Sequence, residues 1–261
     1  MMKNMFFFFS LLRTSIRASI HRRGAFLIES MLMITSNLIF YLIWYLFFLH
    51  FDTVKGWKIE DMIVLITIGS GGYGLMQICF GGTKKLSAAI INGDLDPFMV
   101  QPKNLLLHVI GSQSNAKGWG QLATSLIMIF LGGLYSPFDL LLILIGVISA
   151  GLVFTSMNVI AHSLPFWFGS MQTLAKKYGD ALFLFALYPT NIYSGLLQIM
   201  MFTLIPAGII GYLPVELIRE FSWVKLLQLI TAAATFTSIA FIVFYSGLKR
   251  YESGNQFGIR M

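Results

Sequence analysis

The chain has 261 residues, of which 57% are apolar and only 11% are charged, whereas soluble proteins carry about 25% charged residues. With 24 Phe and a single Cys, this composition excludes a soluble enzyme, a disordered chain and a disulfide scaffold. The net charge of +7 does not indicate a nucleic acid partner, because the basic residues flank apolar segments, as in the cytoplasmic loops of membrane proteins. The sequence predicts an all-α polytopic membrane protein with one membrane domain over residues 1–261.

Residues 1–24 are predicted to form an amphipathic interfacial helix in the inner headgroup region of the membrane. Its apolar residues recur at helical spacing: Phe9, Leu12, Ile16 and Ile20. Its basic residues, which would face lipid, are Arg13, Arg17, Arg22 and Arg23. These charges follow the apolar stretch rather than precede it, so the segment is not a signal peptide. The alternative is a disordered basic tail that only sets the topology.

Six transmembrane helices are predicted, because one span needs about 20 mainly apolar residues. They cover residues 26–50, 62–82, 121–135, 138–168, 181–213 and 223–248. The third is short and reaches adequate length only if residues 117–120 lie at the interface. The fifth is too long for one span and is interrupted by Pro189 and Pro206. We expect a helix followed by a re-entrant or interfacial segment before the last span, and the alternative is one kinked, steeply tilted helix.

The basic residues predict the orientation of these spans. With the N-terminus in the cytoplasm, 14 of the 18 Lys and Arg fall on inner segments and 4 on outer segments. Lys and Arg concentrate in cytoplasmic loops, so both termini are predicted to be cytoplasmic. Glu29 lies within the first span and is interpreted as snorkelling or pairing with Arg22 or Arg23 rather than as a proton relay.

No motif in the sequence indicates catalysis. Residues 69–74 match G-x-G-x-x-G, but they lie inside an apolar span, where small residues favour close helix packing rather than nucleotide binding. No phosphate-binding loop of the form G-x-x-x-x-G-K-[ST] is present, and the four His are scattered without metal-ligand spacing. We therefore expect no enzyme activity and no cofactor or metal in this chain.

Residues 84–117 are predicted to form a cytoplasmic coupling loop. The loop is longer and more apolar than a simple connection requires, and it is expected to offer a docking surface. The residues that would form this surface are Gly93, Asp94, Leu95, Asp96, Pro97, Phe98 and Pro102. The alternative is an amphipathic stretch that rests on the bilayer.

A family resemblance rests on several short motifs. The most specific is the pattern G-x-L-D-x-x-apolar-x-x-P over residues 93–102, and the others are residues 185–189, residues 212–214 with Glu216, and the tail 251–255. Together with the basic N-terminal helix and six spans, these motifs resemble the permease subunits of type-2 ABC exporters. The chain is most similar to the bacterial branch in which two related permeases are encoded with a separate ATPase. The short third span departs from the family pattern.

The resemblance implies a function that composition alone does not. Two permeases, identical or homologous, would form the translocation path in the bacterial inner membrane, and cytoplasmic ATP-binding subunits would bind and hydrolyse ATP. The N-terminal helix and the coupling loop would contact these subunits, and re-entrant helices would close the path on the outside. Two alternatives remain: a secondary transporter or channel subunit without an ATPase, and a membrane-embedded enzyme. Scarce buried charge argues against the first, and the missing catalytic residues argue against the second.

Overall fold

The computed structural model describes residues 2–251, with side chains from Phe6 onward, and this part of the chain is helical without a β-strand. The longer helices are α1 (Met2–His21), α2 (Arg23–Phe48), α3 (Ile59–Cys79), α7 (Ala116–Leu131), α8 (Pro137–Ser163), α10 (Gln172–Ala186) and α13 (Trp223–Leu248). The shorter ones are η1 (Gly81–Lys85), α4 (Leu86–Asn92), α5 (Asp96–Met99), α6 (Leu105–Gly111), α9 (Pro165–Phe168), η2 (Thr190–Ile192), α11 (Leu196–Met200), η3 (Gly208–Tyr212) and α12 (Leu213–Arg219).

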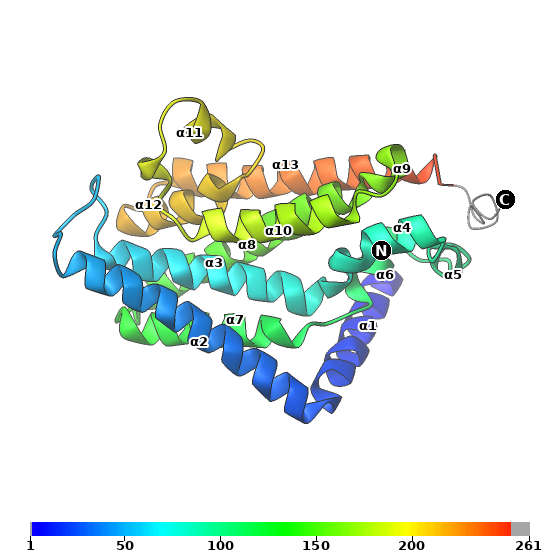
Figure 1. The fold of residues 1–261 in the computed structure, drawn as a ribbon, viewed down its shortest axis with the longest axis horizontal. Coiled ribbons are helices and arrows are strands. Elements are labelled where there is room, and N and C mark those ends of the chain that lie inside the picture. The colour runs from blue at the N-terminus through cyan, green and yellow to red at the C-terminus, as the bar shows by residue number, and fades with distance from the viewer. Residues whose placement is uncertain (1, 252–261) are drawn as a thin grey trace.

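The long helices other than α1 lie side by side as a bundle with two distinct ends (Figure 1). One end carries α1, α4, α5 and α6, and we call it the α1 end (Figure 1). The other carries α12 and the loop between α2 and α3, and we call it the α12 end (Figure 1). The predicted N-terminal helix is present as α1, so the alternative of a disordered tail is wrong for residues 2–21.

Four segments of the described chain are long and apolar enough to cross a membrane: Arg23–Phe48, Ile59–Cys79, Pro137–Phe168 and Trp223–Leu248. They confirm four of the predicted spans as helices, over residues 26–50, 62–82, 138–168 and 223–248. The other two predicted spans are represented by shorter helices, α7 with 16 residues and α10 with 15. Each is shorter than the roughly 20 residues that cross the hydrocarbon core.

Helix α3 lies at the centre of the bundle and contacts α2, α7 and α8. Its small residues make these contacts close. A Cβ atom at Gly72 would lie 2.5 Å from the Cβ of Ala150 on α8, and one at Gly74 would lie 2.8 Å from the carbonyl oxygen of Gly118 on α7. The glycine-rich stretch 69–74 therefore serves helix packing, as its position in an apolar span predicts.

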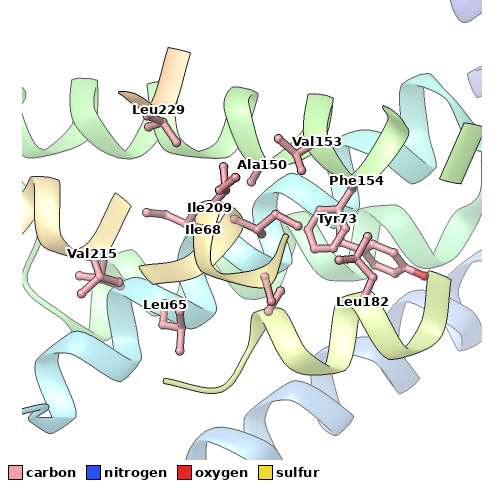
Figure 2. Packing of buried hydrophobic residues seen from close by; sticks show 14 of the residues in the cluster. Leu65, Ile68, Tyr73, Ala150, Val153, Phe154, Leu182, Ile209, Val215 and Leu229 are labelled. Carbon is pink, nitrogen blue, oxygen red and sulfur yellow. The ribbon is translucent and has the colours of Figure 1, made fainter. Parts of the chain in front are cut away.

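The main hydrophobic core surrounds α3 and collects side chains from α8, α10, η3, α12 and α13 (Figure 2). Tyr73 stacks on Phe183 with ring centroids 4.2 Å apart and meets Phe154 edge-on at 5.2 Å. Ile209 and Val215 pack into the same cluster from the segment before the last span (Figure 2). This core joins the long helices to the short ones that precede α13.

Helix α2 is joined to α7 by side-chain hydrogen bonds as well as by apolar packing. Asn37 Nδ2 donates hydrogen bonds to Gln121 Oε1 at 2.7 Å and to Thr124 Oγ1 at 3.2 Å, and the Ser30 hydroxyl donates to the carbonyl oxygen of Ala116 at 3.1 Å. Such interhelical hydrogen bonds link transmembrane helices. Only 6% of the most apolar window of α2 is buried inside the protein, against 89% for α3.

The predicted fifth span is not a continuous helix. Helix α10 begins at Gln172, earlier than the predicted residue 181, and ends at Ala186. The chain then forms η2, α11 and η3 before α12, with Gly195 at φ +60° and Pro206 in the turn that precedes η3. The alternative of a single kinked helix is therefore wrong. The early start of α10 escapes prediction because Lys176, Lys177 and Asp180 lower the hydropathy of its first turns.

Candidate functional site

The α1 end brings together the two segments that the sequence singles out, the N-terminal helix and residues 84–117. The ring of His108 on α6 lies between Phe7 of α1 and Phe98 of α5, with centroid distances of 4.9 and 4.8 Å and edge-on geometry in both pairs. Phe8 stacks on Phe80 at 5.7 Å. Burial lowers the pKa of His108, which favours the neutral ring in this aromatic cluster.

Residues 84–117, the predicted coupling loop, are largely helical: they hold the end of η1, the whole of α4, α5 and α6, and the first two residues of α7. Their apolar side chains form a second core with the ends of α8, α9 and α13, which includes Leu86, Leu95, Leu106, Phe166 and Phe244. Gly93 ends α4 with φ +79°, a conformation that glycine adopts readily. Asn104 caps α6 by accepting a hydrogen bond from the backbone N–H of Leu107 at 3.0 Å.

Leu95 does not belong to a docking surface, contrary to the prediction, because its side chain is 0% exposed within the second core. Phe98 is half-buried against the same core and against His108. The apolar side chains that do reach the surface follow them: Met99 is 48% exposed and Val100 is 83% exposed. Helical periodicity cannot predict which of these side chains are buried and which are exposed, because α5 has only four residues.

The other predicted residues of this segment lie around α5. Asp94, Pro97 and Pro102 are exposed, and Pro97 occupies the first turn of α5, where its missing N–H is tolerated. Asp96 does not cap α5 with its side chain, which instead accepts a hydrogen bond from the hydroxyl of Tyr251 at 2.9 Å.

Tyr251, just after α13, links the end of that helix to α5 through its hydrogen bond with Asp96. Burial, together with the Asp96 carboxylate, raises the pKa of Tyr251 to about 12. The hydroxyl therefore keeps its proton at neutral pH and donates to Asp96. The rest of the tail motif, residues 252–255, lies outside the described residues.

All four predicted arginines are exposed: Arg13, Arg17, Arg22 and Arg23. Arg22 also lines a cavity of about 590 Å³ between the end of α1, the start of α2, η1 and the α6–α7 connection. Glu29 and Lys85 line the same cavity. Among residues 2–251 no ion pair joins Glu29 to Arg22 or Arg23, so the pairing suggested by sequence is not formed.

Chemically, the α1 end offers exposed guanidinium groups, exposed apolar side chains and a polar cavity. Nowhere in the described ranges do three His, Cys, Asp or Glu side chains gather to hold a metal ion. Arginine and methionine are enriched in protein–protein interfaces, and basic side chains attract anionic lipid headgroups. The α1 end is therefore suited to contacts with a protein or a membrane surface.

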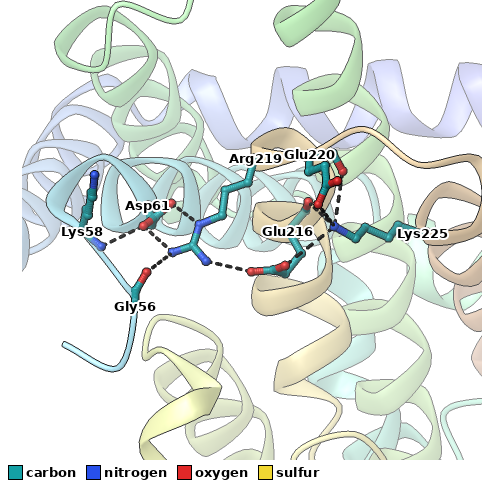
Figure 3. A network of polar contacts seen from close by, with 7 residues as sticks. All are labelled: Gly56, Lys58, Asp61, Glu216, Arg219, Glu220 and Lys225. Carbon is teal, nitrogen blue, oxygen red and sulfur yellow. Dashed lines mark hydrogen bonds and ion pairs between the residues drawn. The ribbon is translucent and has the colours of Figure 1, made fainter. Parts of the chain in front are cut away.

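The α12 end holds an ionic network that sequence reasoning missed (Figure 3). The guanidinium of Arg219 on α12 donates from Nε to Asp61 Oδ1 at 2.5 Å, and its Nη2 donates to Asp61 Oδ2 and to the carbonyl oxygen of Gly56. Its Nη1 lies 2.8 Å from Glu216 Oε1, and the guanidinium lies over the Trp57 ring at 5.0 Å. The hydrogen bonds that Arg219 donates to Asp61 raise the pKa of Arg219 most, and the neighbouring Glu216 carboxylate raises it further.

The network joins α12 to α3 and to the α2–α3 loop. Lys225 extends it to α13, with its Nζ 3.7 Å from carboxylate oxygens of Glu216 and Glu220 (Figure 3). Asp61 and Arg219 are 158 positions apart, so no spacing in the sequence reveals the pair. Arg219 is one of the four basic residues that the charge count puts on outer segments, and that placement is the one signal in the sequence.

The chain matches a family model described as "ABC-2 family transporter protein" over residues 32–255. The match covers most of the described chain, from α2 to the end of α13, and includes residues 81–117. No curated protein sequence matches the chain.

Proposed function

The chain belongs to the ABC-2 family of transporter proteins, and from that premise we propose that it is the permease of an ATP-driven exporter that couples to a separate cytoplasmic ATPase. A permease of this family is the membrane component of an ABC transporter and is not itself catalytic. Its family membership implies an ATP-binding partner subunit. ATP is then bound by that partner, and no cofactor is required in this chain.

The observation that carries this proposal is the convergence of α1, α5 and α6 at one end of the bundle. An ATPase can move the spans only through a part that is exposed to it and also packed against them. Met99 and Val100 supply the exposed part. Leu95 and Phe98, immediately before them, pack against the second core, which contains side chains of α13. Motion of the surface is thereby transmitted to a membrane-spanning helix.

We propose that α7 and α10 complete a set of six spans despite their length. Helix α7 packs along both α2 and α3, and α10 packs along α8. Irregular backbone at membrane depth is tolerated where it is buried in protein. The segment between α10 and α13 fits a re-entrant or interfacial element on the outer side, since Ile209 and Ile210 are buried in the main core. On this view the whole chain forms one permease domain.

The natural setting of this domain is proposed to be a bacterial inner membrane, with both ends of the chain in the cytoplasm. A second permease, identical or homologous, would complete the path. Helix α2 would contact lipid or this partner, because only 6% of its apolar window is buried inside the protein.

We expect cysteine labelling to report this orientation. In a variant that lacks Cys79, Lys55→Cys in the α2–α3 loop should react with a membrane-impermeant thiol reagent in intact cells. Lys177→Cys on α10, which is exposed at the α1 end, should react only after the cells are permeabilised. Both lysines are exposed, so access to the compartment decides the result. The reverse pattern would place the α1 end outside the cell.

Co-purification tests the function itself. A tagged chain extracted from its native membrane should purify with an ATP-binding subunit, and the complex should hydrolyse ATP in a vanadate-sensitive manner. A secondary transporter or channel subunit would instead purify without an ATPase and transport without ATP. Transport that continues after ATP depletion would therefore contradict the proposal.

A further inference from the structure

A second polar cavity lies at the α1 end, between α8, α10 and η1, and has a volume of about 150 Å³. It is lined by Lys84, Asn158, His162, Lys176, Gly179 and Asp180. None of these residues lines the larger cavity beside Arg22. Pockets for whole drug-sized ligands measure about 300–1,000 Å³, so this cavity has room for one small charged group.

Helical spacing gathers these side chains. Asn158 and His162 are four residues apart on α8, and Lys176 and Asp180 are four residues apart on α10, so each pair occupies one helix face. Gly179 keeps the space between the two helices open. A Cβ atom at Gly179 would lie 2.5 Å from Asn158 Oδ1, which leaves no room for a larger residue without displacing the Asn158 side chain.

His162 is fully buried, and only one of its two ring nitrogens has a hydrogen-bond partner among the described residues. Its Nδ1 lies 2.7 Å from the hydroxyl oxygen of Ser87, whereas its Nε2 has no hydrogen-bond partner in the described part of the chain. The Ser87 hydroxyl also lies 3.2 Å from the backbone carbonyl oxygen of His162. In the tautomer whose Nδ1 accepts from this hydroxyl, the ring proton lies on Nε2. Buried polar groups are nearly always hydrogen-bonded. An acceptor in the cavity would satisfy this N–H.

The charges around the cavity favour an anion. Lys84 donates from Nζ to the Tyr73 hydroxyl at 3.0 Å and lies over the same ring. Across residues 2–251 neither Lys84 nor Lys176 forms an ion pair. Asp180 is the one acid among the described side chains that line the cavity, so two ammonium groups face a single carboxylate.

We propose that this cavity binds a phosphate group, either free or in the headgroup of an anionic lipid. Lysine ammonium groups bind phosphate oxygens through charge-assisted hydrogen bonds, and in the tautomer with its proton on Nε2 the His162 ring supplies a further donor. Asp180 at the same cavity opposes the anion and limits its affinity. This site lies outside the proposed ATPase contact, and it is tested on the purified permease without any ATPase, so either proposal can fail alone.

The test uses the full chain in two arms. In the first, thermal unfolding in lipid-free detergent is followed as inorganic phosphate is titrated, with chloride at matched ionic strength as the reference. In the second, native mass spectrometry measures the lipid retained from nanodiscs of phosphatidylcholine alone or mixed with phosphatidylglycerol.

Three variants make the test specific. Lys176→Gln should weaken binding about tenfold or more, since charged hydrogen bonds contribute at that level. Lys177→Gln removes the neighbouring exposed lysine, which does not line the cavity, and should leave binding unchanged. Asp180→Asn should strengthen binding because it removes the opposing charge.

The two arms distinguish the sources of the phosphate. Saturable binding of inorganic phosphate that depends on Lys176 assigns a free phosphate group, and Lys176-dependent retention of phosphatidylglycerol assigns a lipid headgroup. The proposal is overturned if Lys176→Gln and Lys177→Gln behave alike in both arms. It is also overturned if Asp180→Asn weakens binding, which is the response of a cation site.

Discussion

Replacing Met99 and Val100 together by aspartate is expected to abolish ATPase co-purification and ATP-driven transport while leaving the permease folded. Both side chains are exposed at the end of α5, and Val100 is 83% exposed. Surface substitutions usually change stability by less than about 0.5 kcal/mol. The substitutions replace two apolar contacts at the proposed interface with charges. Such contacts can contribute about 2 kcal/mol or more to the free energy of binding. The measurements are thermal unfolding of the purified variant, bound ATPase per permease, and transport.

Two further variants separate contact from folding. Val100→Thr keeps the branched shape without a charge and should retain most of the bound ATPase. Leu95→Ala removes a side chain that is fully buried in the second core and should lower the free energy of unfolding by about 2–5 kcal/mol. If the double aspartate variant binds the ATPase and transports normally, residues 94–102 are a connection that rests on the bilayer.

Replacing Arg219 by methionine is expected to lower the free energy of unfolding by about 3 kcal/mol. The Asp61 carboxylate, whose side chain is only 11% exposed, would lose its bidentate partner and remain as an uncompensated charge near the core. The α12 segment would lose its ion pair with α3 and keep only its apolar packing there. Thermal unfolding of the purified permease measures the effect.

A double-mutant cycle identifies the pair as the cause. Combining Arg219→Met with Asp61→Asn should lower the free energy of unfolding by less than the sum of the two single changes. The reason is that Asp61→Asn removes the unpaired carboxylate charge. Lys225→Met serves as the control at the same network. Its Nζ lies 3.7 Å from Glu216 and Glu220 oxygens, so its loss should cost about 1 kcal/mol or less. Equal effects of Arg219→Met and Lys225→Met would contradict the central role of Arg219.

The features predicted from sequence are those that depend on local composition. Length and hydropathy decide which segments cross a membrane, and α2, α3, α8 and α13 follow that rule. Small residues inside an apolar span predict packing, and Gly72 and Gly74 make the expected close contacts. The basic and apolar spacing of residues 1–24 predicts a helix there, and α1 is that helix.

The features that escape prediction depend on partners distant in the chain. Leu95 and Val100 are both apolar and five positions apart, yet only Leu95 meets the core that Phe166 and Phe244 provide. The structural role of Asp61 depends on Arg219, its partner in the ion pair. The helical form of residues 84–117 likewise comes from the shared second core, because helices of seven residues or fewer are marginal alone.

The burial of α3 has a consequence for how the protein is made. Among the four long segments, α3 has the lowest hydropathy, 1.6 against 1.8 for α2, 2.5 for Pro137–Phe168 and 2.0 for α13. It leaves the ribosome after α2 but before α7 and α8, the helices that cover most of it. During that interval its glycine-rich face lacks the helices that pack against it, and its Asp61 carboxylate lacks Arg219, which is synthesised later still. We therefore expect α3 to stay beside α2 or an insertase until α7, α8 and α12 have been synthesised.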